Sequence, residues 1–103
     1  MHRRGILCGG CWLVDHNNSI SHWPEQETLT HIVSREIQGG GPAHNVAIDL
    51  ARLMPGFPVW AMGGVGDDDA GRFLRAACET HGIDASRLAV LSGAGTSHTD
   101  VMT

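Results

Sequence analysis

Residues Gly39-Gly40-Gly41-Pro42-Ala43-His44-Asn45 form the stretch on which the interpretation of this chain depends. Three consecutive glycines leave the backbone almost free of steric limits on φ, so that it can approach another molecule closely. Pro42 presets a helical φ, and an amphipathic run follows. The stretch therefore predicts a flexible glycine turn that leads into a helix over 42–54, whose free N–H groups and dipole favour polar or anionic ligands. Asn45 lies in the first turn, and its amide can both donate and accept hydrogen bonds.

A second glycine stretch, Gly63-Gly64-Val65-Gly66-Asp67-Asp68-Asp69-Ala70-Gly71, follows after a short apolar run. A glycine cluster alone is typical of an ordinary loop as much as of a binding turn. Taken together and in this order, the two stretches resemble the N-terminal region of the ribokinase/PfkB family of carbohydrate kinases. In that family a Gly-Gly-(x)-small-x-Asn segment opens a helix, and a G-x-V-G-x-D-x-x-G segment follows the next strand. His81-Gly82-Ile83-Asp84 resembles the segment that closes the family's next helix, so the resemblance covers nearly the whole chain.

The resemblance implies an α/β fold, ribokinase-like, with a Rossmann-like and mostly parallel sheet flanked by helices. Residues 1–103 would form the N-terminal part of such a domain, with a small β lid segment inserted at about 17–38. In the family the lid covers the substrate and often forms a dimer contact. The order strand, helix, strand, helix, strand also predicts a parallel α/β sheet from the residue pattern itself.

The resemblance also implies a function, namely ATP-dependent transfer of the γ-phosphoryl group to a hydroxyl of a sugar or nucleoside. ATP and Mg²⁺ would be the cofactors of the full-length parent, and none is expected to bind tightly to this fragment. The family's catalytic base belongs to a later Gly-x-Gly-Asp segment, expected beyond residue 103, so the 103-residue chain alone is expected to be inactive. No metal ligand and no catalytic residue is assigned within the chain. The residues carried over for substrate hydroxyls are Asp15, Gly40, Gly41 and Asn45.

Asp15 also attracts attention through its position. It follows an apolar run, and open α/β sheets bind ligands at the carboxyl ends of their strands. A turn-forming aspartate beside His16-Asn17-Asn18 is the alternative interpretation. A carboxylate suits sugar hydroxyls because it accepts two or more hydrogen bonds.

The periodicity predicts the remaining elements. One buried strand is expected over Ile6–Val14 and a short one over Val59–Met62, after which the glycines turn the chain. A helix over Ala70–His81 is expected to begin at Asp68 or Asp69 and to end at Gly82. Further strands are expected at Leu88–Leu91 and 96–103. The first helix should bury Ala43, Val46, Ala47, Leu50, Ala51 and Leu53, and the second Phe73, Leu74, Ala77 and Cys78.

Composition and charge exclude several classes of protein. The net charge of −4 and the absence of a basic stripe argue against nucleic-acid binding. Residues 1–4 and the apolar run 5–14 superficially resemble a short leader, but no small-x-small cleavage site follows and the run is too short to span a membrane. We therefore expect a cytoplasmic protein with no membrane contact. The sequence does not identify which sugar or nucleoside is bound.

Two other classes of function remain open. The segment Ser19–Gln38, which contains Trp23, could make the chain a non-catalytic module that binds a partner or forms a homodimer. Alternatively, Cys8 and Cys11 have the C-x-x-C spacing of thiol and metal proteins. Since Trp12-Leu13-Val14 follows as a strand pattern and no second ligand pair exists, buried reduced thiols in or beside a strand are the preferred interpretation.

Overall fold

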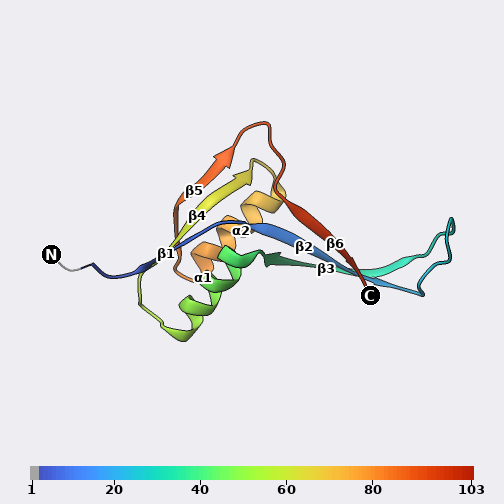
Figure 1. The fold of residues 1–103 in the computed structure, drawn as a ribbon, viewed down its shortest axis with the longest axis horizontal. Coiled ribbons are helices and arrows are strands. Elements are labelled where there is room, and N and C mark those ends of the chain that lie inside the picture. The colour runs from blue at the N-terminus through green and yellow to red at the C-terminus, as the bar shows by residue number, and fades with distance from the viewer. Residues whose placement is uncertain (1–2) are drawn as a thin grey trace.

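The computed structural model describes residues 3–103, so residues 1 and 2 of the leader-like start lie outside the described part. The described residues form two three-stranded sheets and two helices (Figure 1). In chain order the elements are β1 (Ile6–Gly9), β2 (Leu13–Ile20), β3 (Ile32–Gly40), α1 (Pro42–Leu53), β4 (Val59–Gly66), α2 (Asp69–Thr80), β5 (Asp84–Leu91) and β6 (His98–Met102).

The first sheet has the strand order β1-β4-β5, and all of its neighbours are parallel. Both helices pack on one face of this sheet, α1 against β1 and β4 and α2 against β4 and β5. The parallel α/β plan predicted from the sequence is confirmed. Alternate residues of β4 point toward the helices, and Val59, Ala61 and Val65 are buried there. The core continues through Leu74 and Leu88, which are almost completely buried.

The opposite face of the first sheet is not covered by any described element. Leu7, Met62 and Leu91 lie on it and keep 51%, 47% and 50% of their surface exposed. The strand register explains this, because Leu7 and Met62 alternate with the residues that face the helices. The chain thus presents a sheet with one buried and one bare apolar face.

The second sheet has the strand order β3-β2-β6, with β3 antiparallel and β6 parallel to β2. Its β2–β3 hairpin projects from the body of the molecule, at the right of Figure 1. The connecting residues 21–31 are mostly exposed, and Trp23 and Leu29 keep 75% and 92% of their surface open to solvent. The molecule is accordingly elongated, measuring 62 × 33 × 19 Å.

The expectation of a single buried strand over Ile6–Val14 is wrong. The chain breaks after Gly9, because Gly10 takes φ +141 and sends the backbone out of the first sheet. Leu13 then begins β2 in the second sheet, and Ile6 is partly exposed. As a consequence Asp15 does not follow a strand but lies inside β2.

In both glycine stretches, residues that were expected to form turns belong to strands. Gly39 and Gly40 are the last residues of β3 and pair with β2, so only Gly41 forms the turn. Likewise β4 continues through Gly63 and Gly64, which were expected to turn the chain. Glycine tolerates extended pairing when a neighbouring group occupies the space of its missing side chain.

The two helices have nearly the predicted bounds, but some of the predicted buried residues are wrong. Val46 and Leu53 of α1 are exposed, whereas His44 and Ile48 are buried. Phe73 of α2 is 40% exposed. Helical periodicity gives the direction of a stripe, but the exact edges depend on where the sheet lies beneath the helix. No helix among residues 3–103 is long and apolar enough to span a bilayer.

Candidate functional site

Asp15 lies on β2 between the two other strands of the second sheet. It is the register partner of Gln38 on β3 and of Thr99 on β6. Residues directly opposite each other in a sheet point to the same face. The Thr99 hydroxyl donates a hydrogen bond to Oδ1 of Asp15. The carboxylate is therefore held from one side and is half-buried rather than free in solvent.

Gly40 makes room for this carboxylate. A Cβ atom added at Gly40 would lie 2.6 Å from Oδ2 of Asp15 and 3.0 Å from Cδ1 of Leu13. The first distance is shorter than real Cβ contacts allow. The absence of a side chain at position 40 thus lets Oδ2 rest over the end of β3, directly before α1 begins.

Gly41 connects this strand end to the helix. It has φ +96 and ψ 152, and an added Cβ would lie 2.4 Å from the carbonyl oxygen of Cys11. Both observations require glycine, since L-residues rarely adopt this φ and backbone atoms cannot yield. The first intrahelical bond runs from the Asn45 N–H to the Gly41 carbonyl at 2.9 Å. N–H groups earlier in the first turn have no partner within the helix and are available to a ligand.

Asn45 is oriented by its neighbour His44. Nδ1 of His44 lies 3.0 Å from Oδ1 of Asn45, and because an amide oxygen only accepts, the imidazole is the donor. The His44 ring is fixed in turn: it packs edge-on against Trp12, with centroids 5.8 Å apart, and it lies against the backbone of Gly39. The Trp12 Nε1–H donates to the Met62 carbonyl at 3.0 Å. The free amide hydrogens of Asn45 remain available for a ligand oxygen.

The structure thus brings the four predicted residues to one region, where β2, β3 and the start of α1 meet. Asp15 and Gly40 are in direct contact, and Gly41 follows at once in the chain. Asn45 lies in the first turn of α1 and lines a cavity of about 610 Å³ between β3, α1 and α2, whose lining does not include Asp15, Gly40 or Gly41. Sequence reasoning missed Thr99 and the orienting role of His44. The alternation of apolar and polar residues over 96–103 assigns Thr99 to one face of a strand. It does not show that Thr99 pairs with Asp15 of β2.

The other face of the second sheet carries a separate polar network. The His16 and His98 rings are stacked with centroids 5.4 Å apart, and Nδ1 of His16 lies 3.3 Å from Oδ1 of Asp100. Asn18 is fully buried and accepts a hydrogen bond from Nε of Arg35 at 2.7 Å. These contacts bind β6 and β3 to β2 and so support the strands that carry Asp15 and Thr99.

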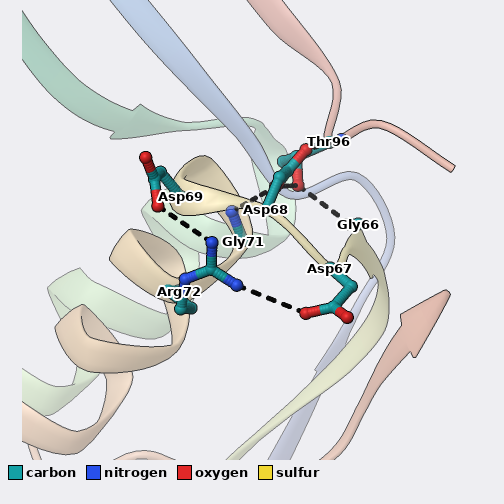
Figure 2. Close-up of polar contacts among 7 residues, drawn as sticks. All are labelled: Gly66, Asp67, Asp68, Asp69, Gly71, Arg72 and Thr96. Atoms are coloured by element: carbon teal, nitrogen blue, oxygen red, sulfur yellow. Dashed lines mark hydrogen bonds and ion pairs between the residues drawn. The ribbon is translucent and has the colours of Figure 1, made fainter. Parts of the chain in front are cut away.

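The three aspartates at 67–69 serve the start of α2 (Figure 2). Oδ1 of Asp68 accepts a hydrogen bond from the Gly71 N–H at 2.8 Å, so Asp68 is the N-cap of α2. The sequence had offered Asp68 or Asp69 for this position. Asp67 and Asp69 form ion pairs with Arg72 at 3.3 and 2.8 Å. Residues Gly64-Val65-Gly66-Asp67 also have the spacing of a Gly-x-Gly-Asp segment. The carboxylate of Asp67 is exposed and forms an ion pair with Arg72.

Asp68 also bonds across to Thr96, at the start of the connection into β6. The Thr96 hydroxyl donates to Oδ1 of Asp68 at 2.6 Å, and the Thr96 N–H donates to Oδ2 at 2.8 Å. The same hydroxyl accepts from the Gly66 N–H at 2.8 Å. These donors, the Thr96 hydroxyl first, lower the pKa of Asp68 from 3.8 to about 2, because they stabilise the ionised carboxylate. We call Gly66, Asp68, Gly71 and Thr96 the capping network; it joins β4, α2 and the approach to β6.

The cysteines do not have the arrangement of a thiol centre. Cys8 is buried in β1 and burial raises its pKa, which disfavours the reactive thiolate. Burial likewise raises the pKa of Cys78 to about 11. Cys11 is exposed, which corrects the expectation of buried thiols at that position. Within residues 3–103 there is no group of three or more His, Cys, Asp or Glu suited to a metal ion.

Comparison with known proteins gives the family. Residues 10–102 match the family model of the pfkB family carbohydrate kinases. This chain belongs to the pfkB family. The match covers both sheets' central strands and both helices, and it confirms the resemblance drawn from the two glycine stretches.

Relatives of this pfkB-family chain are considerably longer than the chain itself. It is 39% identical over 84 residues to 5-dehydro-2-deoxygluconokinase of Geobacillus kaustophilus (strain HTA426), which covers 82% of this chain and 22% of that protein. The nucleoside kinase of Methanocaldococcus jannaschii, a ribokinase-family member, has a TM-score of 0.83 at 24% identity over 98% of this chain and 33% of its own. Aminoimidazole riboside kinase of Salmonella enterica, solved with aminoimidazole riboside and an ATP analogue, has a TM-score of 0.73 at 29% identity, covering 94% and 28%. The fold is therefore ribokinase-like.

Proposed function

We propose that this chain provides the part of an ATP-dependent kinase that binds the hydroxyl-bearing substrate, a sugar or nucleoside that receives the γ-phosphoryl group. The observation that carries the proposal is the Asp15 carboxylate, held by Thr99 and seated over Gly40 beside the start of α1. The N–H groups at the start of α1 and the Asn45 amide follow within five residues of Gly40 along the chain. This set can accept from and donate to neighbouring hydroxyls at once.

The substrate class follows from the relatives. The name of the Geobacillus relative gives its substrate as 5-dehydro-2-deoxygluconate, and the Salmonella enzyme was solved with a riboside. Both compounds carry several hydroxyls on a short carbon skeleton. We take 5-dehydro-2-deoxygluconate as the first candidate for the parent of this chain, because the curated relative is 39% identical. Residues Asp15, Gly40, Gly41 and Asn45 would bind it.

In the same proposal the segment 17–38 acts as a lid, and its hairpin forms the contact of a homodimer in the cytoplasm. The support is its projection from the body and the exposure of Trp23 and Leu29. ATP and Mg²⁺ would belong to the parent kinase. The described residues offer no cluster of ligands for the ion, so the role proposed for this chain is limited to the sugar.

The test is a titration of the isotope-labelled chain with 5-dehydro-2-deoxygluconate and with D-ribose, followed by NMR. We expect saturable shifts at Asp15, Gly40 and Asn45. Asp15→Asn should weaken binding by about tenfold or more, since hydrogen bonds to a charged group contribute about 1.5–3 kcal/mol. Glu79→Gln, on the exposed side of α2, serves as the control and should bind like the wild type. Absence of shifts at these three residues, or an Asp15→Asn variant that binds normally, would contradict the proposal.

A further inference from the structure

The Asp15 carboxylate has two oxygens in different surroundings. Oδ1 receives the hydroxyl of Thr99, which lies 84 positions later in the sequence and directly opposite in the parallel register. Oδ2 lies over Gly40, where no side chain intervenes. Without the Thr99 hydrogen bond, the Asp15 side chain could also populate its other staggered χ1 rotamers, which would carry the carboxylate away from Gly40.

We propose that Thr99 is a positioning residue for substrate binding: its hydroxyl fixes the Asp15 carboxylate so that Oδ2 faces the substrate beside the α1 start. The inference rests on the proposed function for its substrate, and goes beyond it by assigning a residue on β6. A fixed acceptor binds a hydroxyl more tightly than a mobile one, because less side-chain freedom is lost on binding.

The position of Thr99 is itself well determined. Three residues earlier, Thr96 is tied into the capping network by hydrogen bonds of 2.6–2.8 Å to Asp68 and Gly66. On the far side of the strand, Asp100 contacts His16 of β2 at 3.3 Å. β6 is thus anchored at its approach and across its other face, and the Thr99 hydroxyl is presented to Asp15 by a strand with little freedom to shift.

Threonine is common in strands for its shape alone. The matched pair Thr99→Val and Thr99→Ser separates that role from the hydroxyl's role. Valine keeps the branched shape and removes the donor, whereas serine keeps the donor and removes a methyl group. Thr80→Val, at the exposed end of α2, controls for loss of a hydroxyl elsewhere.

Two readouts decide the proposal. The first is the set of three-bond Hα–Hβ couplings of Asp15, which we expect to indicate one rotamer in the wild type and in Thr99→Ser, and rotamer averaging in Thr99→Val. The second is the Kd for 5-dehydro-2-deoxygluconate or D-ribose, whichever binds, expected to rise about five- to tenfold in Thr99→Val and to recover in Thr99→Ser.

The outcomes separate this proposal from the function on which it rests. If neither carbohydrate binds the wild type, the proposed function fails, and the couplings alone decide the role of Thr99. Unchanged Asp15 couplings in Thr99→Val, or averaged couplings in Thr99→Ser, overturn the positioning role. Should Thr99→Val not fold, as judged from its amide spectrum, Thr99→Ala against Thr99→Ser makes the same comparison.

Discussion

Glycine at position 40 is required by its neighbour rather than by its own backbone. Gly40 lies in β3 without a left-handed φ, so an L-residue could adopt its conformation. The obstacle is the Asp15 carboxylate, 2.6 Å from the place of a Cβ. At the residue scale we therefore predict that Gly40→Ala displaces the carboxylate and weakens carbohydrate binding by about tenfold or more, the loss expected for a charged hydrogen bond.

The matched control is Gly95→Ala, because a Cβ at Gly95 meets nothing within 4 Å and its φ is not in the left-handed region. Calorimetry or NMR titration of both variants measures binding, and thermal unfolding measures stability. We expect Gly40→Ala to retain most of its stability, since the two groups that an added Cβ would displace, Oδ2 of Asp15 and Cδ1 of Leu13, belong to side chains. Equal affinities for the two variants would contradict the assigned role of Gly40.

At the scale of elements, the capping network links the start of α2 to the approach of β6. Thr96 is buried and satisfies both the Gly66 N–H and Asp68. We predict that Thr96→Val lowers the free energy of unfolding by about 1–3 kcal/mol, the cost of leaving a buried partner unsatisfied.

The capping network also makes the stability of the fold sensitive to acid. Because folding lowers the pKa of Asp68 from 3.8 to about 2, its stabilisation is complete above about pH 4 and is lost as the pH falls toward 2.

Urea unfolding between pH 2 and pH 5 measures this dependence. The wild type should lose stability steadily below pH 4, and Asp68→Asn should be less stable at pH 5 and show a flatter profile, since it has no carboxylate to protonate. Asp69→Asn is the control, because the Asp69 carboxylate is paired with the exposed Arg72 and lies outside the capping network. Parallel acid profiles for the wild type and Asp68→Asn would show that another group dominates.

Sequence patterns located both helices almost to the residue because local signals define them. Pro42 and Asp68 mark the helix starts, and Gly82, at φ +69, marks the end of α2. The strands were harder, since the break at Gly10 depends on which sheet each half joins. A continuous apolar run does not reveal that β1 and β2 belong to different sheets.

In the candidate site, too, contacts between residues far apart in the sequence were harder to predict than local ones. Family resemblance selected Asp15 and the glycines, and the structure places Asp15 against Gly40. Thr99 was missed because its role depends on pairing between strands far apart in the sequence, and no local spacing encodes the register of a parallel pair. His44 was missed for a related reason: its contact with Asn45 is local, but its burial against Trp12 is not.

At the scale of the whole molecule, the bare face of the first sheet should govern solution behaviour. Leu7, Met62 and Leu91 each lie on this face, one on each of its three strands, and exposed apolar surface of this kind favours association. We predict that the chain binds an apolar dye and shows a scattering mass above its monomer value of 11.0 kDa. The double variant Met62→Lys and Leu91→Lys should lower both the dye signal and the apparent mass, with little change in thermal stability.

Leu29→Lys is the control for the dye signal of that experiment. Leu29 is more exposed than any of the three patch residues but lies on the hairpin connection, outside the sheet face. It should leave dye binding unchanged. The scattering mass separates the two contacts, because Leu29→Lys should weaken the hairpin contact proposed above, whereas the double variant should remove association through the sheet face. A mass that falls in Leu29→Lys but not in the double variant would contradict a role for the sheet face.

The parallel pairing of β6 with β2 has a consequence for synthesis on the ribosome. Asp15 and Thr99 are separated by 84 positions, almost the full length of the chain, and the loop between them must close before their bond can form. Contacts of such long sequence separation slow folding. During translation Asp15 emerges early, yet it has no hydroxyl partner until Thr99 has also left the exit tunnel. A nascent chain therefore acquires the Asp15–Thr99 geometry only after β1, β4, β5 and both helices have been made.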